Sequence, residues 1–340
     1  MAGICYAFNN FFLGQLAHHG LVAVIYVNIP SFLLFMIVYA VNLIRNKVMH
    51  GFYWRKEVSI FFREEDNTFD FSVLLGAILM SISKFCGFCL VVMTFHYANA
   101  AGMNLGIITV IFNFCCITDS VVFYFVFKEK LSRAQLVGSG VLLLSAVFIA
   151  QKPENSTDTA KSSYGRFPGE TQQVYWDRVE AIERDHYFNS MVAIGTALCS
   201  TLFFSARDVI LRYYKVNKQY PAFELSLDSL TLYSFACCLY ALYLFGFKGY
   251  VFDWASFYAG CMSAVLNTLG FMMLGISVVI GYAGPANALN SIQAIILTGL
   301  GVMMMNHIPT DMQVAGMLLG MTGTIIVSIG DPLMKLVTRC

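Results

Sequence analysis

Apolar and polar positions are arranged in blocks along this chain. Long apolar runs are separated by short polar or glycine-containing connections. A helix needs about 20 apolar residues to cross the hydrocarbon core of a bilayer. We predict ten such helices, at residues 2–17, 21–44, 71–97, 101–127, 134–150, 188–211, 222–246, 255–280, 284–306 and 311–330. The pattern therefore predicts an all-α integral membrane protein with ten transmembrane helices.

Composition agrees with this class. Hydrophobic residues make up 58% of the chain and charged residues 12%, which is about half of the charged share of soluble domains. The formal net charge is only +1, so we expect no nucleic-acid partner. The cysteines lie mainly within the apolar runs, and none lies at 151–187. They are therefore expected to be small core residues and not a disulfide framework.

Lysine and arginine gather in connections that would face one side of the membrane. These connections follow the second, fourth and sixth predicted helices, and the tail at 331–340 is basic too. Because such clusters mark the cytoplasmic side, ten spans with both termini cytoplasmic account for all of them. The polar segment 151–187 is then extracellular or lumenal, and Asn155 in it begins a glycosylation sequon.

The end of this polar segment has helical apolar spacing at Val174, Val179 and Ile182, which predicts a short surface helix leading into the sixth span. The sequon and the absence of a transit peptide favour a secretory-pathway endomembrane or the plasma membrane.

The two halves of the chain resemble each other. The stretch from Lys130 and the stretch from Ile308 both have a polar start, a Gln, a Gly three residues later and then an apolar run. Further matched pairs are Tyr97-Ala98 with Tyr282-Ala283, and Gly87-Phe88 with Gly270-Phe271. Five spans per repeat is an odd number, so the second copy would be inverted in the membrane. We predict a first repeat at 1–150, an extramembrane loop at 151–187, an inverted repeat at 188–330 and a cytoplasmic tail at 331–340.

The stretch from Glu129 to Gly138 has the form E-K-L-S-x-x-Q-x-x-G and leads into the fifth predicted helix. With the short hairpin before the fourth helix and the five-plus-five arrangement, it resembles the drug/metabolite transporter superfamily, in particular the eukaryotic solute carriers of the nucleotide-sugar and triose-phosphate type. The resemblance implies a cavity lined by spans one to four and six to nine. Spans five and ten would pack at the edge. In that branch the ninth span often carries a substrate-contacting Gly-Ala-Leu-Asn-Lys; here the matching stretch keeps Asn290 and has Ser291 in place of the lysine.

Lys84 lies at the centre of the third predicted helix, far from either end of an apolar run. A charge at this depth requires a carboxylate, a water-filled cavity or a ligand. Aligning the two repeats pairs Lys84 with Asn267, so both would line opposite walls of one midplane cavity. Lys84 would bind an anionic group or exchange a proton there. The alternative is a structural ion pair with Asp119 in the fourth span.

Other polar residues at membrane depth complete the candidate site. Asn287, Asn290 and Gln293 form a stripe on the ninth span that would face the cavity, with helix–helix contact as the alternative. Arg207 and Asp228 are expected to pair on the cytoplasmic side, as a structural contact or a gate. Spaced small residues such as Gly102/Gly106, Ala134/Gly138 and Gly316/Gly320 predict close helix packing, which includes a homodimer contact as an option.

These features predict a secondary transporter of a small polar or anionic metabolite that works by alternating access. Sugar phosphates, nucleotide-linked sugars and amino-acid-like solutes all suit the candidate site. The expected partners are the substrate, the lipid bilayer and a proton or counter-substrate. No acid, base and nucleophile set, Walker loop or metal-ligand spacing is present, so we expect no enzyme, cofactor or metal site. A non-transporting membrane scaffold or chaperone on the same fold is the alternative.

Overall fold

The computed structural model describes residues 1–53, 61–62, 68–128, 132–150, 172–279, 292–305 and 308–337. In this part of the chain the regular elements are all helices, apart from a single β-bridge between Phe62 and Phe69. Their bounds are α1 Ala2–Leu16, η1 Ala17–Val22, α2 Ala23–His50, α3 Phe71–Ala100, α4 Leu105–Thr109, η3 Val110–Phe114, α5 Cys115–Phe127, α6 Arg133–Ala150, α8 Gln172–Lys218, α9 Ala222–Gly246, α10 Trp254–Val279, α12 Ile292–Met305 and α13 Asp311–Val337. The predicted all-α class is confirmed.

Five helical segments among the described residues are long and apolar enough to cross a membrane. They are Ala2–His50, Phe71–Ala100, Leu105–Phe127, Gln172–Lys218 and Ala222–Gly246. Shorter apolar helices cover Arg133–Ile149, Ile292–Met304 and Asp311–Val327. These lengths indicate a multi-pass membrane protein. The count of ten spans and the inverted repeat stay predictions.

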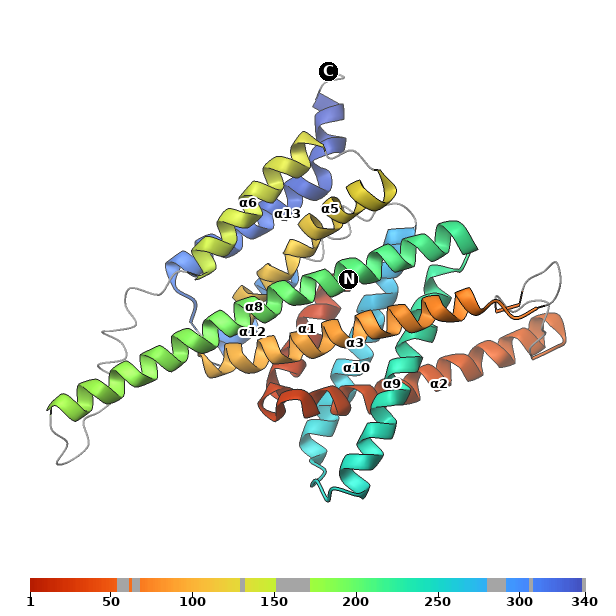
Figure 1. The fold of residues 1–340 in the computed structure, drawn as a ribbon, viewed down its shortest axis with the longest axis horizontal. Helices are drawn as coiled ribbons and strands as arrows, with labels where there is room; N and C mark the ends of the chain where they lie inside the picture. The colour runs from red at the N-terminus through yellow and green to blue at the C-terminus, as the bar shows by residue number, and fades with distance from the viewer. Residues whose placement is uncertain are drawn as a thin grey trace.

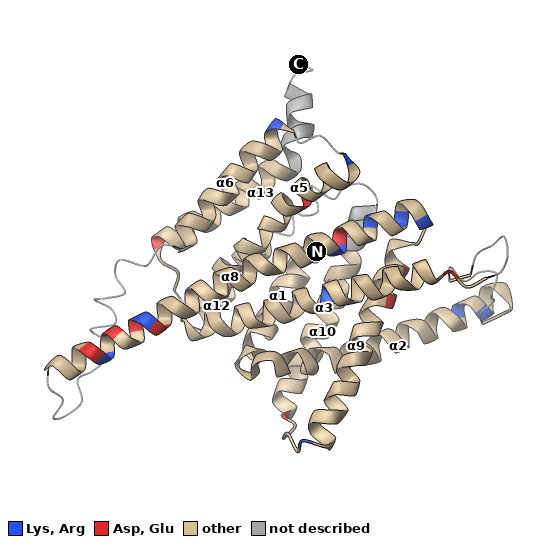
Figure 2. Cartoon of the chain, viewed as in Figure 1, with Lys and Arg blue, Asp and Glu red and all other residues tan. Residues whose placement is uncertain are grey.

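The helix α8 is much longer than the predicted sixth span. It begins at Gln172, so the expected surface helix is continuous with the membrane segment. Its 47 residues extend about 70 Å at 1.5 Å per residue, more than twice the hydrocarbon thickness of about 30 Å. Charged residues of both signs gather at its first end (Figure 2). This end therefore projects beyond the hydrocarbon layer.

A kink at Gly20 separates α1 from α2. The backbone there has φ 58° and ψ −137°, a conformation that glycine adopts without steric cost. As a result α1 and α2 run in different directions although the chain stays helical on both sides (Figure 1). The kink lies between the predicted helices at 2–17 and 21–44.

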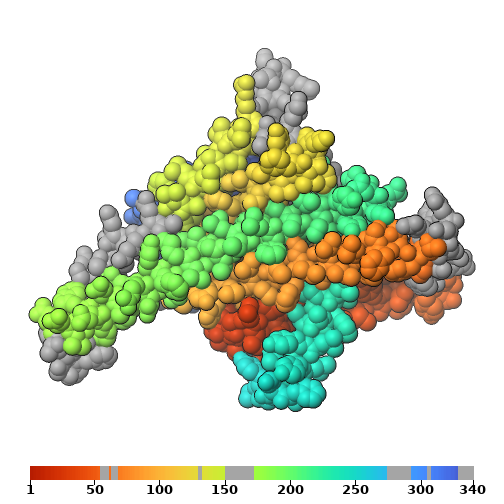
Figure 3. Space-filling model, viewed as in Figure 1, coloured from red at the N-terminus to blue at the C-terminus, as the bar shows by residue number. Residues whose placement is uncertain are grey.

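The long helices α3 and α8 pack side by side across the molecule (Figure 1), and their contact forms a continuous surface in Figure 3. Asp70 and Lys218 join the first end of α3 to the last residue of α8, with 3.0 Å between the Lys218 Nζ and the Asp70 Oδ2. The Asp70 side chain also accepts a bond from the Ser72 N–H and so caps α3. Hydrogen bonding from Ser72 and from Lys218 holds the pKa of Asp70 well below its ordinary value.

The helices α6 and α13 pack against each other at one edge of the molecule (Figure 1), where the family resemblance places spans five and ten. Their backbones approach closely because glycines face the partner helix. A Cβ added at Gly138 would lie 2.7 Å from the Val327 backbone nitrogen and 2.8 Å from the Gly323 carbonyl oxygen. The predicted close packing at Gly138 is therefore confirmed.

Replacing Gly138 with alanine should destabilise the protein by about 1–3 kcal/mol, because the clash is with backbone that cannot rotate away. Gly140 is the matched control, since a Cβ added there on the same helix meets nothing within 4 Å. The measurement is the thermal unfolding midpoint of each purified variant. Equal midpoints for Gly138→Ala and Gly140→Ala would contradict the tight α6–α13 contact.

Candidate functional site

A cavity of about 160 Å³ lies between the helices. Its walls come from α1, α3, η3, α5, α8, α9, α10 and α12, so both halves of the sequence contribute. Lys84 and Asn267 both line it, which brings together the two residues paired by the repeat alignment. Gln293 lines the same cavity.

Lys84 is 6% exposed and projects from the middle of α3. Its Nζ donates to the Ser229 Oγ at 2.8 Å and to the Ser226 carbonyl oxygen at 3.2 Å, both on α9. The ammonium also lies 4.0 Å from the centre of the Phe271 ring. Among the described residues, Lys84 forms no ion pair with a carboxylate. The hydrogen-bond partners of its Nζ are thus neutral oxygens, and the paired charges of Arg207 and Asp208 line the same cavity. The alternative pairing with Asp119 is not observed in this part of the chain.

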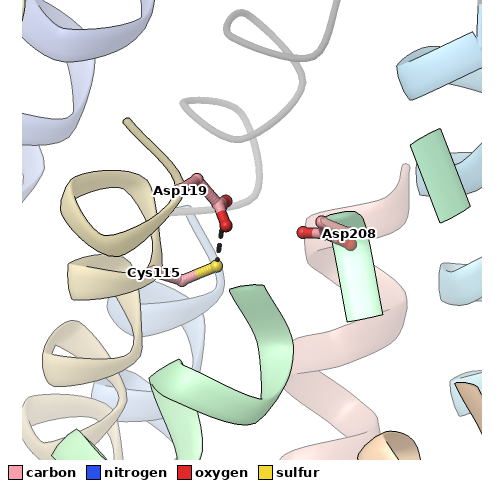
Figure 4. A group of neighbouring side chains, drawn as sticks. All are labelled: Cys115, Asp119 and Asp208. Carbon is pink, nitrogen blue, oxygen red and sulfur yellow. Dashed lines mark hydrogen bonds between the residues drawn. The ribbon is translucent and has the colours of Figure 1, made fainter. Parts of the chain in front are cut away.

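Asp119 lies instead in a small group with Cys115 and Asp208 (Figure 4). The Cys115 thiol donates to the Asp119 Oδ2 at 3.2 Å, and the Asp119 Oδ1 is buried without a hydrogen-bond partner. One ligand atom from each of the three residues lies within 4.8 Å of the others. Figure 4 shows Cys115 and Asp119 on one helix and Asp208 facing them from another.

Arg207 already engages the carboxylate of Asp208. Its Nε donates to the Asp208 Oδ1 at 2.8 Å and its Nη2 to the Oδ2 at 3.0 Å. A cation bound beside Cys115 and Asp119 would therefore compete with the guanidinium, and we assign no metal to this group. The guanidinium also lies 5.7 Å from the centre of the Phe271 ring, so Arg207 and Lys84 share this aromatic neighbour.

Arg207 and Asp228 were predicted to pair with each other, but in the structure each has other partners. Arg207 and Asp208 both line the central cavity. Asp228 on α9 accepts hydrogen bonds from the hydroxyl groups of Tyr39 on α2 and of Tyr220, which lies between α8 and α9. Arg207 is therefore a cavity residue, and Asp228 belongs to a separate tyrosine cluster.

A chain of amide contacts crosses the cavity between α10, α1 and α12. The Ser263 hydroxyl donates to the Asn9 Oδ1 at 2.7 Å, and the Asn9 amide donates to the Asn10 Oδ1 at 3.2 Å. The Asn10 amide then donates to the Gln293 Oε1 at 3.3 Å. Gln293 thus faces the cavity, as predicted for the ninth span. Asn287, Asn290 and Asn155 lie outside the described residues.

The sequence prediction missed several residues that line the cavity, among them Tyr6, Asn9, Asn10 and Tyr233. Two adjacent asparagines inside an apolar first helix were the available sign, because buried amides need partners within the protein. The tyrosines gave no comparable sign, since aromatic residues occur throughout the apolar runs.

No known family model matches this sequence, and no curated protein matches it. The functional assignment therefore depends on the geometry of the cavity.

Proposed function

We propose that this protein is a secondary transporter of a small polar or anionic metabolite and works by alternating access. It would belong to the drug/metabolite transporter type, with ten spans in two inverted repeats. Transport of this kind needs no covalent chemistry. Both termini would be cytoplasmic, in a secretory-pathway or plasma membrane. The lysine and arginine residues at the right-hand ends of α2 and α8 in Figure 2 support this orientation.

The main observation is the environment of Lys84. A charge held at membrane depth is costly and is expected to have a partner. The described hydrogen-bond partners of its Nζ are the uncharged Ser226 and Ser229, and the residue lines a cavity. The second cation, Arg207, is already neutralised by Asp208. Lys84 therefore leaves a positive charge available for the carboxylate or phosphate of a substrate.

The composition of the walls supports movement of the two halves around this charge. Residues from α1, α3 and α5 face residues from α8, α9, α10 and α12 across the cavity. In transporters with internal repeats, the substrate is held where the two halves meet, and one half rocks against the other. The amides of Asn10 and Gln293 meet across the same boundary, and they provide hydrogen-bond donors and acceptors for a hydroxyl-rich solute.

Uptake into proteoliposomes tests this proposal. A panel of radiolabelled carboxylates, sugar phosphates, nucleotide-linked sugars and amino acids is offered, with the inside loaded with unlabelled solute or held at a different pH. We expect saturable uptake of at least one class above the level of protein-free liposomes. No uptake of any class under either gradient would contradict transport and favour a membrane scaffold.

A further inference from the structure

An apolar groove lies beside the central cavity, and the two share one side chain. We define the lateral groove as the hollow of about 390 Å³ between α2, α3 and α9. Its members include Leu21, Ile82, Phe85 and Tyr240, which are exposed on the outside of the helices. These helices belong to candidate membrane spans, so the exposed members face lipid. Tyr233 lines both the lateral groove and the cavity.

Tyr233 separates the two spaces at a point close to Lys84. It is 7% exposed, and its ring lies 6.4 Å from the ring of Phe85, centre to centre. Ser229, which accepts a hydrogen bond from the Lys84 ammonium, lies four residues before Tyr233 on α9. Positions four apart lie on the same helix face, about one turn of 5.4 Å from each other. The charge is thus one helical turn from the side chain that closes the lateral groove.

The cavity is small and contains the charge of Lys84, whereas the lateral groove is larger and apolar. Ligand pockets usually enclose about 300–1,000 Å³, and the cavity of about 160 Å³ is below this range. The volume of the lateral groove is within this range. Among the described residues of its lining, Ser81 alone carries an aliphatic hydroxyl and none is charged. A ligand that filled both would have an anionic group at Lys84 and a hydrocarbon chain between α3 and α9.

We infer that the substrate is an anionic amphiphile, with its carboxylate or phosphate at Lys84 and one hydrocarbon chain in the lateral groove past Tyr233. This inference depends on the proposed transport function, because it specifies the substrate class of the same cavity. Access would be lateral, from the bilayer, because exposed side chains of the lateral groove face lipid. Movement of the Tyr233 ring away from Phe85 would join the two spaces.

The test is ligand binding to the full chain in lipid nanodiscs. Binding is measured as the shift in thermal unfolding midpoint with increasing ligand concentration. The probes are dodecyl phosphate and dodecanoate, each compared with its butyl counterpart. Long chains concentrate in the bilayer whether or not a groove exists, so the comparison is made between variants and not between chain lengths. Ala236→Trp fills the groove, since Ala236 lines it and is exposed. Leu239→Trp is the control, because Leu239 is 53% exposed on the same helix and outside the lateral groove.

We expect Ala236→Trp to weaken the binding of at least one dodecyl probe by about tenfold, a difference of about 1.4 kcal/mol. The Leu239→Trp variant should bind the dodecyl probes as the unaltered protein does. In the Lys84→Ala variant, the probes should no longer shift the thermal unfolding midpoint. The binding of the butyl probes should be weakened by Lys84→Ala and unchanged by Ala236→Trp.

Three results would overturn the inference. If butyl and dodecyl probes bind and Ala236→Trp affects neither, the substrate is a water-soluble anion and the proposed transport function stands. If dodecyl probes act equally on all variants, including Lys84→Ala, their effect is one of the bilayer alone. If no probe of either length shifts the midpoint, both the inference and an anion-binding cavity are contradicted.

Discussion

Replacing Arg207 with alanine is expected to destabilise the protein by about 3–5 kcal/mol, because it leaves the Asp208 carboxylate without its charged partner among the helices. Both oxygens of Asp208 accept from the guanidinium, and the side chains of Arg207 and Asp208 are 15% and 18% exposed. The thermal unfolding midpoint in a mild detergent or in nanodiscs measures the loss. Arg184→Ala is the matched control, since Arg184 is exposed on the same helix α8.

A double-mutant cycle separates the pair from other effects of the substitution. Arg207→Gln combined with Asp208→Asn removes both charges. The loss of stability in the double variant should therefore be smaller than the sum of the losses in the two single variants. Additive losses, or an Arg207→Ala midpoint equal to that of Arg184→Ala, would contradict a strong Arg207–Asp208 pair in the cavity wall.

Replacing Lys84 with methionine should have the opposite effect in the absence of ligand. A buried charge with uncharged partners costs desolvation energy, and an apolar side chain of similar length removes that cost. The Ser229 hydroxyl still donates to the Ser226 carbonyl oxygen at 2.9 Å, so this pair of groups keeps a hydrogen bond. We expect the variant to match the unaltered protein or to exceed its free energy of unfolding by about 1–4 kcal/mol.

The thermal midpoint without ligand measures this effect, and Lys248→Met on an exposed loop is the control. A loss as large as that predicted for Arg207→Ala would show that Lys84 is a structural residue. Residues retained at a cost in stability are typical of functional sites.

Much of the helical framework was predictable because membrane helices require long apolar runs. The structure begins α3 at Phe71 and α9 at Ala222, as the sequence pattern predicted. The full extent of α8 was not predictable from hydropathy, since its first part is charged and gains nothing from lipid. Helical spacing gave the only indication of it.

Part of the candidate site was predictable from the depth of Lys84 in its apolar run and from the alignment of the two halves of the sequence. Aligning the two predicted repeats placed Lys84 and Asn267 in one cavity, and both residues line the cavity in the structure. The partner of Arg207 was not predictable in this way. Asp208 is its neighbour in the sequence, and which carboxylate a long side chain reaches depends on side-chain rotamers and on packing against rings such as Phe271.

The most direct test of an anion-binding cavity at Lys84 is thermal unfolding of the purified protein and of Lys84→Met against one panel of carboxylates, phosphates and nucleotide-linked sugars. A bound ligand raises the midpoint according to its concentration and affinity. We predict that at least one anion raises the midpoint of the unaltered protein and has no effect on Lys84→Met. Equal shifts in both proteins, or no shift with any anion, would contradict the assignment.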